Sequence, residues 1–585
     1  MESEITTPPL GSGYIPQQPG APAYTDPYQS TGHTFVGEET FVGEEQYYWA
    51  EEQVDEQVDE QVEEPQSQVE GEPAYRVPEV APAGWSAAGS RRRTWVSRGI
   101  LAFILLAQAL LSVRLRNTAF EDEALYLYAG HMEIAHLFHG AALNYGYNSY
   151  FSGSPVLYPV AAAALDSVWG LDGARALSLV CMLASTGFLY AISRRLFNER
   201  VGLFAAFLFA VSQSTIVLGW FATYDAPAIF LLAFSAWVVV RFADSNAFTV
   251  LIAAPVLVLA FCTKYAAGIF IPTVVALAVI VAWPHQGARA LWRGVLLSAA
   301  MAVLGATVVY GSPIMAGIES TTTSRAHGTD SASSLLGMSV DWIGLTLALA
   351  VWGSVSYLRR GRMSEVAAAA QQPLAAQPGR LWRTLLCLLL CGTGLLATAY
   401  QIHLSTSVSL YKHVGFGLFF FAPLAALGVS RIVGPHFRRT EIGLLIVAVA
   451  LSSGIAQSDW RFQTWPNATQ LVALLKPQVT GTGEYLADTA EVPTYYLRDI
   501  TAASQWTGTY TFSYTATKGT RLTGPAAYTA ALDSGYFNLV VLDSSPATAI
   551  DRAIAKTLPS SSRYRLYAVL PFTNTWGSYQ IWIRT

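Results

Sequence analysis

The sequence predicts an all-α polytopic membrane protein with about 11 transmembrane helices, a small C-terminal extracytoplasmic α/β domain and a disordered N-terminal tail. Of its 585 residues, 52% are hydrophobic and only 13% are charged, whereas soluble proteins carry about 25% charged residues. The charge is also unevenly distributed: residues 1–90 have a net charge of −17 and the remainder +12. An acidic tail on a basic, apolar body excludes an ordinary soluble enzyme and argues against a nucleic-acid-binding protein.

Residues 1–90 form the predicted disordered acidic cytoplasmic tail. They are rich in Pro, Gly, Gln and Glu and include short duplications such as TFVGEE-TFVGEE, and their few apolar residues cannot offset the entropy of an ordered chain. The chain begins MESEITTPPL without a basic segment before an apolar stretch, so we expect no cleavable signal peptide. Arg91–Arg93 and Arg98 instead lead into an apolar run that ends at Val113, as in an uncleaved signal anchor.

Residues 91–457 are predicted to form the polytopic domain, because a run of about 20 apolar residues can cross a hydrocarbon core of about 30 Å. The predicted spans are residues 95–113, 174–193, 201–219, 226–241, 247–263, 266–283, 294–311, 339–358, 383–400, 413–430 and 441–457.

The basic residues predict the orientation of these spans. With the N-terminus inside, 18 basic residues fall on inner segments and six on outer ones, and such a bias favours the cytoplasmic side for the richer set. The inner set is Arg91, Arg92, Arg93, Arg98, Arg194, Arg195, Arg200, Arg241, Arg289, Arg293, Arg359, Arg360, Arg362, Arg380, Arg383, Arg431, Arg438 and Arg439. The outer set is Arg114, Arg116, Arg175, Lys264, Arg325 and Lys412. Residues 458–585 are therefore predicted to lie outside the cell membrane.

Those last residues are predicted to form a small α/β domain. GEYLAD and FNLVVLD are typical of buried strands, YRLYAVLPF and SYQIWIRT alternate as strands do, and ATAIDRAIAKTL is an amphipathic helix. We see no catalytic constellation in this domain. The four cysteines, Cys181, Cys262, Cys387 and Cys391, lie in apolar runs, which indicates core packing instead of disulfides or a metal cluster.

The densest group of charges follows the first span, at Glu121, Asp122 and Glu123, with Gly130, His131 and Glu133 just after it. Three adjacent carboxylates repel one another unless water, a cation or a substrate shares the site. The alternative is an interfacial amphipathic helix whose N-terminus favours acids.

Further candidates lie at the outer ends of other spans. Asp225 precedes Pro227 and could equally be a helix N-cap, and Lys264 could equally extend its ammonium toward water. The loop from Gln401 to His413 adds His403, Tyr411, Lys412 and His413. The predicted topology nevertheless places Asp122, Asp225, Lys264 and Lys412 on one membrane face, where buried charges favour a functional site. Carboxylates beside cations suit a reaction between a lipid-linked anionic donor and a hydroxyl acceptor.

These motifs resemble the polytopic C-type glycosyltransferases, closest to the protein O-mannosyltransferase and lipid A aminoarabinose transferase groups (family 39/83-like). AFEDEALYLYAGH is similar to their acidic first-loop motif, and the run from Ser154 to Ser212 to their Pro-Leu-Tyr-Pro-like re-entrant segment and Ala-Arg-rich second span. TYDAPAIF, FCTKYAAGIF and SLYKHVGFGLFFFAPLAALG match later landmarks in order. The resemblance covers roughly residues 95–435. One departure is Phe151-Ser152-Gly153-Ser154-Pro155, where the aminoarabinose branch commonly has a lysine.

The resemblance implies a polyprenyl-phosphate-linked sugar as donor, transferred with inversion to a hydroxyl acceptor on a protein, a cell-wall glycan or a glycolipid. It implies that Asp122 is the base or acceptor orienter, with Asp225 second and Glu123 as a supporting acid. Lys264 and Lys412 are the candidate partners of the donor phosphate, with His413, Arg114 and Arg116 as weaker ones. No cofactor is required; a divalent metal stays an open alternative, because some members of the wider superfamily use one.

Two rival classes remain. A polytopic transporter or lipid-linked-sugar flippase also fits eleven spans with charged ends, although such proteins often show inverted repeats and sites at the midplane, and we find neither pattern. A non-catalytic membrane scaffold that displays the outer domain is the third alternative, but it leaves the acidic triplet unexplained.

Overall fold

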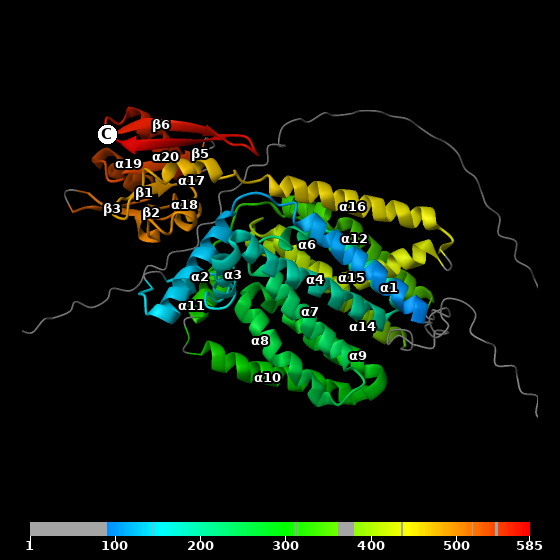
Figure 1. The fold of residues 1–585 in the computed structure, drawn as a ribbon. Helices are drawn as coiled ribbons and strands as arrows, with labels where there is room; N and C mark the ends of the chain where they lie inside the picture. Colours follow the sequence, from blue (N-terminus) through cyan, green and yellow to red (C-terminus); the bar gives the residue numbers. More distant parts are fainter. Residues whose placement is uncertain are drawn as a thin grey trace, which may run out of the picture.

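The computed structural model describes residues 91–143, 146–310, 312, 314–360, 379–434, 437–516, 519–543 and 548–585. The predicted tail, residues 1–90, and Arg362 lie outside the described residues. The remainder is a helical bundle followed by a smaller domain that contains a β-sheet (Figure 1).

The bundle is built from helices of very different length. They are α1 (Arg91–Ser112), α2 (Glu121–His139), η1 (Tyr147–Ser149), α3 (Tyr158–Trp169), α4 (Leu171–Leu196), α5 (Glu199–Ala210), α6 (Gln213–Leu218), α7 (Asp225–Arg241), η2 (Ala247–Ile252), α8 (Ala253–Thr263), η3 (Tyr265–Phe270), α9 (Ile271–Gln286), η4 (Gly287–Ala290), α10 (Leu291–Val309), α11 (Ile314–Ile318), η5 (Glu319–Thr323), α12 (Ala332–Arg360), α14 (Arg380–Leu404), α15 (Leu410–Val433) and α16 (Thr440–Phe462).

All eleven predicted spans are largely helical. Seven helical segments of the described chain are long and apolar enough to cross a membrane, so the polytopic character is confirmed while the count of eleven stays a prediction. The seven are Trp95–Ser112, Leu171–Leu196, Tyr265–Val309, Ala332–Arg359, Arg380–Leu404, Leu410–Val433 and Thr440–Phe462. The expected single span 201–219 is wrong in one respect: the helix breaks between α5 and α6, where the Ser212 hydroxyl donates to the carbonyl of Phe209.

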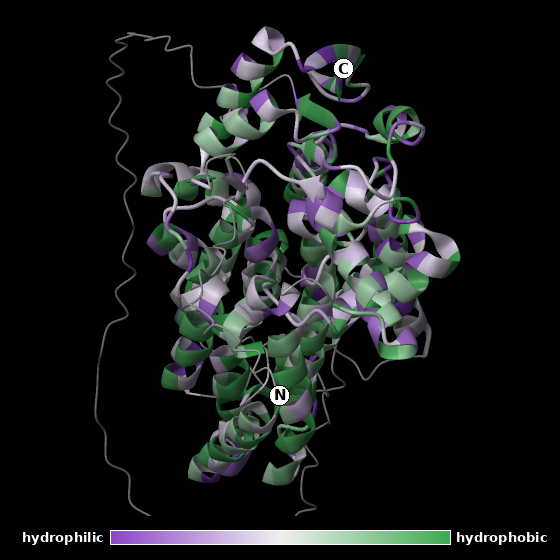
Figure 2. Cartoon of the chain, turned by 90° about the vertical axis from the view of Figure 1, so that its left-hand side faces the viewer, coloured by the Kyte–Doolittle hydropathy of each residue, from purple (hydrophilic) through white to green (hydrophobic). Residues whose placement is uncertain are grey.

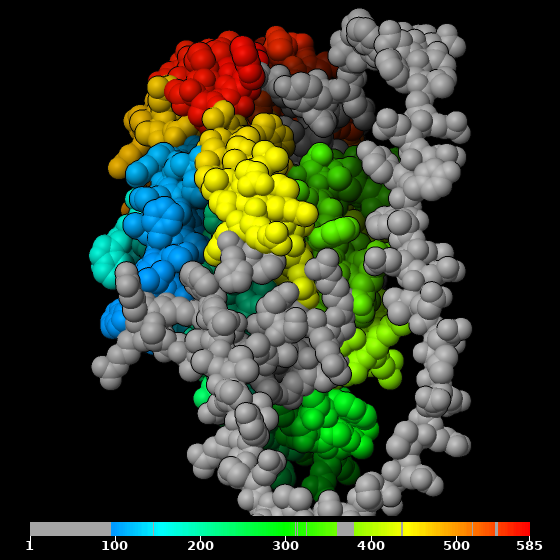
Figure 3. All heavy atoms as spheres, turned by 90° about the vertical axis from the view of Figure 1, so that its right-hand side faces the viewer, coloured from blue at the N-terminus to red at the C-terminus, as the bar shows by residue number. Residues whose placement is uncertain are grey.

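Burial separates the lipid-facing helices from the central one. Hydrophobic residues dominate the long helices of the bundle (Figure 2). On the face shown in Figure 3, α1 (blue) and α16 (yellow) both reach the surface. These two helices carry large exposed apolar side chains, such as Phe103 of α1 and Leu444 of α16, as expected for contact with lipid. In contrast, α15 is almost wholly buried against α5, α12 and α14. The first turn of α15 therefore holds its side chains in fixed positions.

The C-terminal domain confirms the predicted strands and amphipathic helix. Its elements are α17 (Thr469–Leu475), β1 (Tyr485–Ala487), α18 (Glu491–Tyr496), η8 (Ala503–Gln505), β2 (Trp506–Thr507), β3 (Ser513–Thr515), β4 (Arg521–Thr523), α19 (Pro525–Ser534), β5 (Leu539–Asp543), α20 (Ala549–Thr557), η9 (Leu558–Ser560), β6 (Tyr564–Pro571) and β7 (Ser578–Arg584). The sheet has the order β2-β1-β5-β7-β6, with β1 parallel to β2 and β5, and β7 antiparallel to β5 and β6.

Both faces of this sheet are covered. Leu539 and Val541 of β5 point into one apolar cluster, and Val540 and Leu542 into another, because successive strand residues alternate between faces. The domain lies at the end of the bundle that carries α2, α3 and α11 (Figure 1). Within this domain, α18 packs against α2 and is therefore held close to it.

Candidate functional site

A cavity of about 420 Å³ opens at this end of the bundle. Its walls come from α2, the loop after it, η3, η5, α14, α15 and the C-terminal domain. The charged, imidazole and phenol side chains that line it are Glu121, Asp122, Tyr126, Tyr150, Lys264, Tyr265, Arg325, Tyr400, Lys412, His413, Glu491 and Tyr510. Four residues that the sequence singled out thus meet at one cavity, and they come from three separate segments: Asp122, Lys264, and the adjacent pair Lys412 and His413.

Asp122 and Lys412 form an ion pair in this wall. The Lys412 ammonium donates to Oδ2 of Asp122, and the two side chains are 4% and 26% exposed. The same ammonium lies 5.2 Å from the centre of the Phe221 ring, a distance at which cation–π attraction adds to the pair. Lys412 therefore does not extend toward water, and Asp122 lines the cavity as a member of this ion pair.

A second, deeper pair joins Asp225 and Lys264. Lys264 Nζ lies 3.0 Å from Asp225 Oδ1, and neither side chain is more than 5% exposed. The Thr223 hydroxyl donates to the other carboxylate oxygen over 3.1 Å. Asp225 does begin α7, but its carboxylate is committed to the lysine, so the simple N-cap reading is not what the structure shows. Lys264 lines the cavity, so a ligand there would meet the Lys264 ammonium while it is paired with Asp225.

His413 follows Lys412 in the first turn of α15. Its Nδ1 lies 3.1 Å from Nε2 of Gln401, and that amide nitrogen also donates to the carbonyl of Val408. Nδ1 is therefore the acceptor, and Nε2 carries the proton of the neutral ring. Nε2 is buried and has no hydrogen-bond partner within the described residues. It is a donor available to a ligand at the cavity wall.

The backbone next to Lys264 is fixed by the segment that departs from the aminoarabinose pattern. Tyr265 N donates to the carbonyl of Ser152 (2.9 Å), and Ser154 N donates to that of Cys262 (2.8 Å). Between them, a Cβ on Gly153 would lie 2.0 Å from the carbonyl oxygen of Thr263. Only glycine allows the two chains to approach this closely, so residues 152–154 set the position of Lys264.

The acidic side chains at the boundary of the two domains are poorly solvated. Burial, reinforced by the negative charges of Glu491 and Asp122, raises the pKa of Glu121 to about 8. Burial together with Asp122 raises the pKa of Glu491 to about 7. Arg325 stands at the cavity wall as well; burial lowers the pKa of its guanidinium, and Tyr400 opposes that shift.

Four predicted site residues lie outside the cavity lining: Asp225, which is paired with Lys264, and Glu123, Arg114 and Arg116. Glu123 is fully buried and pairs with Arg175 through two hydrogen bonds of 2.8 and 2.7 Å, while it also accepts from Phe120 N and Ala222 N. It is a structural acid that ties three segments together. Arg114 pairs with Asp459 of α16 at 2.7 Å, and Arg116 is exposed.

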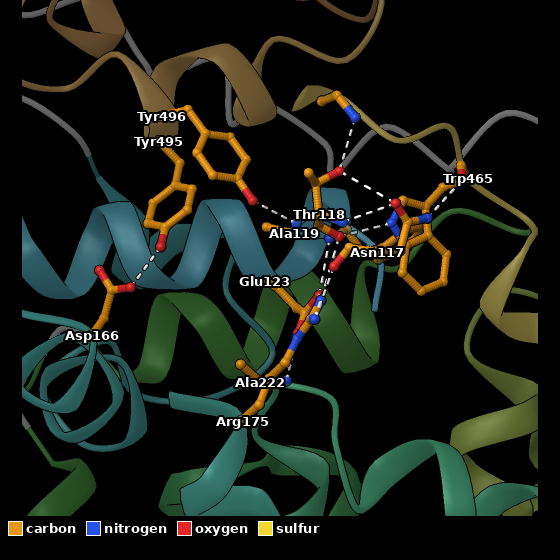
Figure 4. Close-up of polar contacts among 12 residues, drawn as sticks. Asn117, Thr118, Ala119, Glu123, Asp166, Arg175, Ala222, Trp465, Tyr495 and Tyr496 are labelled. Carbon is orange, nitrogen blue, oxygen red and sulfur yellow. Dashed lines mark hydrogen bonds and ion pairs between the residues drawn. The ribbon is translucent and has the colours of Figure 1, made fainter. Parts of the chain in front are cut away.

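The C-terminal domain is docked on α2 and its flanks by several hydrogen bonds (Figure 4). The Tyr495 hydroxyl donates to Asp166 (2.6 Å), and the Tyr496 hydroxyl accepts from Ala119 N (2.8 Å). Trp465 Nε1 donates to the carbonyl of Thr118 over 3.0 Å. Asp166 also contacts His131 at 2.6 Å, and hydrogen bonds from that ring and from Tyr495 lower the pKa of its carboxyl against the opposing effect of burial.

Sequence reasoning missed several cavity residues. Glu491 and Tyr510 belong to the C-terminal domain, in which we saw no catalytic constellation, and no local motif marks either one. Glu121 was visible in the acidic triplet but received no role. Arg325 was counted only as an outer basic residue; its isolation in a polar loop between two apolar runs was the available signal. Within the described residues, no group of three or more His, Cys, Asp or Glu side chains is arranged to hold a metal ion.

Comparison with known proteins gives a family match for part of the chain. Residues 137–310 match the family described as dolichyl-phosphate-mannose-protein mannosyltransferase. No curated protein sequence matches significantly.

Solved structures extend the comparison to most of the chain. The archaeal oligosaccharyltransferase AglB from Archaeoglobus fulgidus, in complex with an inhibitory peptide and a dolichol-phosphate, superposes with a TM-score of 0.50 and 11% identity, covering 84% of this chain and 74% of that chain. Arabinofuranosyltransferase AftD from Mycobacteria (TM-score 0.48, 15% identity, 85% and 40% covered) and ArnT from Cupriavidus metallidurans bound to undecaprenyl phosphate (0.43, 12%, 83% and 98%) are more distant in structure, and we draw nothing from them. The resemblance to polytopic C-type glycosyltransferases is thereby confirmed, by a family match over residues 137–310 and by the fold of the chain.

Proposed function

We propose that this protein is a membrane glycosyltransferase that moves a sugar from a polyprenyl-phosphate-linked donor to a hydroxyl acceptor at the outer face of the membrane, with inversion. The observation that supports this most directly is the single cavity in which Lys264, Lys412 and Arg325 stand beside Asp122. Cations suit the phosphate of a donor, and carboxylates suit the hydroxyl that attacks it.

The two ion pairs fit a phosphate that arrives from the lipid side. Asp122 and Asp225 are the counter-charges of the buried Lys412 and Lys264, which favours the ionised form of both ammonium groups. A donor phosphate adds negative charge, which Arg325 and the Nε2 proton of His413 can meet without breaking either pair. We assign binding of the donor phosphate to Lys264, Lys412, Arg325 and His413.

The acceptor side follows from the remaining groups. Asp122 lines the cavity as the partner of Lys412 and is the residue we assign to orienting the acceptor. Asp225 acts through Lys264, and Glu123 has no place in the chemistry because Arg175 holds it outside the cavity. A metal-dependent variant of this proposal predicts loss of turnover after treatment with a chelator.

Orientation is part of the proposal. The threefold excess of basic residues on the predicted inner segments supports an extracytoplasmic position for the cavity and the C-terminal domain. The transporter and flippase alternatives predict a site near mid-depth, whereas the cavity uses α2, the first turn of α15 and the C-terminal domain at one end of the bundle.

Native-membrane mass spectrometry tests the proposal. A polyprenyl-phosphate sugar should co-purify with the wild-type protein and with Arg116→Ala, whose exposed side chain lies outside the cavity. Arg325→Ala should lose it. Co-purification that persists in Arg325→Ala and in Lys264→Ala would remove the donor site from this cavity.

A further inference from the structure

The short helix α18 carries one face toward the membrane domain. Tyr495 and Tyr496, at its C-terminal end, bond to Asp166 and to the backbone of Ala119, and Figure 4 shows both rings reaching from α18 toward the bundle. Glu491 precedes Tyr495 by four residues, so the two side chains lie on the same face of the helix. The docking contacts therefore aim Glu491 at the beginning of α2.

Glu121 lies at that beginning, two residues after Ala119. Both carboxyl groups line the cavity, together with Tyr510 of the same domain. Oε2 of Glu491 is buried and has no hydrogen-bond partner within the described residues. An unpartnered buried carboxylate oxygen at a cavity wall costs free energy, and a ligand hydroxyl would relieve that cost.

The charges around this pair do not neutralise it. The groups that face it are Asp122 on α2, Lys412 on α15, and Tyr510. Lys412 is engaged by Asp122, and no described lysine or arginine forms a salt bridge with Glu121 or Glu491. Burial and the neighbouring negative charges raise the pKa of both carboxyl groups, to about 8 for Glu121 and about 7 for Glu491, so protonation of the pair near neutral pH is favoured.

We propose that Glu491 of the C-terminal domain is the base that receives the proton of the acceptor hydroxyl, with Glu121 beside it as a neutral hydrogen-bond donor. This inference rests on the proposed function. As the acceptor oxygen bonds to the anomeric carbon of the donor, its proton passes to the Glu491 carboxylate. The bond from that carbon to the phosphate oxygen breaks, and its electron pair leaves with the lipid phosphate.

This assignment divides the cavity between the two parts of the chain. The membrane domain supplies the cations for the phosphate and Asp122 for orientation, while the C-terminal domain supplies the base. The acceptor then enters from the side of the C-terminal domain, because Glu491 and Tyr510 form that wall. The domain completes the site instead of merely covering it.

Infrared spectroscopy of the full-length protein in nanodiscs tests the pair without any substrate. The carbonyl band of protonated carboxyl groups should lose one component with a midpoint near pH 7 in the wild type. Glu491→Gln should abolish that component, and Asp499→Asn, an exposed acid of the same domain, should keep it. A titration that is identical in Glu491→Gln and wild type would overturn the proposal.

Turnover provides the second measurement, with labelled polyprenyl-phosphate mannose as the donor probe and host membranes as the source of acceptor. Glu491→Gln should lower turnover by about 10²–10⁴-fold and remove the rise in rate across pH 7, while binding of undecaprenyl phosphate is kept. Full turnover in Glu491→Gln would refute the assignment. If wild-type protein binds no polyprenyl phosphate, the proposed function fails, whereas the infrared titration still decides the state of the pair.

Discussion

Lys264 Nζ and Asp225 Oδ1 lie 3.0 Å apart in a place where neither side chain is more than 5% exposed. The two residues belong to different segments, the junction between α8 and η3 and the start of α7. Each charge is tolerated only because the other is present, since an isolated ion at this depth loses most of its solvation.

Removing one member of the Asp225–Lys264 pair should lower the stability of the protein, and replacing the other member as well should restore it. Asp225→Asn leaves the Lys264 ammonium buried without its counter-charge, so we expect a loss of about 3–5 kcal/mol in the free energy of unfolding. The double variant Asp225→Asn/Lys264→Met should recover most of that stability while binding of undecaprenyl phosphate stays weak. Thermal unfolding and lipid binding in nanodiscs measure the two effects. Equal stability of the single and double variants would contradict the pairing.

Asp122→Asn should separate catalysis from donor binding. The substitution keeps the shape of the side chain and removes its charge from Lys412, whose ammonium then remains free for a phosphate. We expect turnover to fall by about 10²-fold or more, with binding of undecaprenyl phosphate unchanged or tighter. Lys264→Ala should instead weaken binding and turnover together. Weaker lipid binding in Asp122→Asn would show that this carboxylate serves the donor.

Glu123→Gln should affect stability before chemistry. The Arg175 side chain is 2% exposed and donates two hydrogen bonds to Glu123. The substitution leaves its buried guanidinium without a counter-charge, so we expect a loss of about 3–5 kcal/mol in the free energy of unfolding. Thermal unfolding in detergent measures it, and the matched control is Glu441→Gln, an exposed acid on α16. A variant of normal stability that lacks turnover would restore Glu123 to the chemistry.

The C-terminal domain should lose stability as the pH rises. Burial, reinforced by Asp551 and Asp543, raises the pKa of Asp488 to about 8 from its usual value near 4, so the folded state binds more protons than the unfolded one between these limits. The contribution of protonated Asp488 to the free energy of unfolding is complete below pH 4 and is lost as the pH rises through 8. Asp488→Asn should remove this pH dependence, because an amide does not titrate in this range. The fold should be kept, because the Asn oxygen can still accept the hydrogen bond from Asp543 N. Hydrogen exchange of β1 and β5 at pH 6 and pH 8, corrected for the intrinsic rate, checks it.

Cysteine labelling in intact cells tests the orientation. The exposed Thr482, in the C-terminal domain, and the exposed Ala288, between α9 and α10, lie on predicted opposite sides. Thr482→Cys should react with an impermeant maleimide and Ala288→Cys should not. The native cysteines are buried or half-buried, which keeps the background low. The reverse pattern would place the cavity in the cytoplasm and end the proposed function.

The sequence was informative wherever a signal is local. Apolar runs predicted the positions of the helices and of β5, alternation predicted β6 and β7, and charges at the ends of the spans pointed to Asp122, Lys264 and Lys412. The ion-pair partner of each charged residue was not predictable, because it depends on contacts between segments that are distant in the sequence. Glu123 and Asp122 are neighbours in one acidic triplet, yet Glu123 pairs with Arg175 and Asp122 pairs with Lys412. Glu491 reaches the cavity only through the docking of a separately folded domain.

The close approach at Gly153 has an evolutionary consequence. Because a Cβ at this position would collide with the carbonyl of Thr263, a mutation there is acceptable only if the chain before Lys264 moves as well. We therefore expect residues 152–154 and 262–265 to change together among homologous sequences. Descendants that lost glycine at 153 should carry a remodelled Cys262–Tyr265 turn, and with it a different placement of the buried lysine.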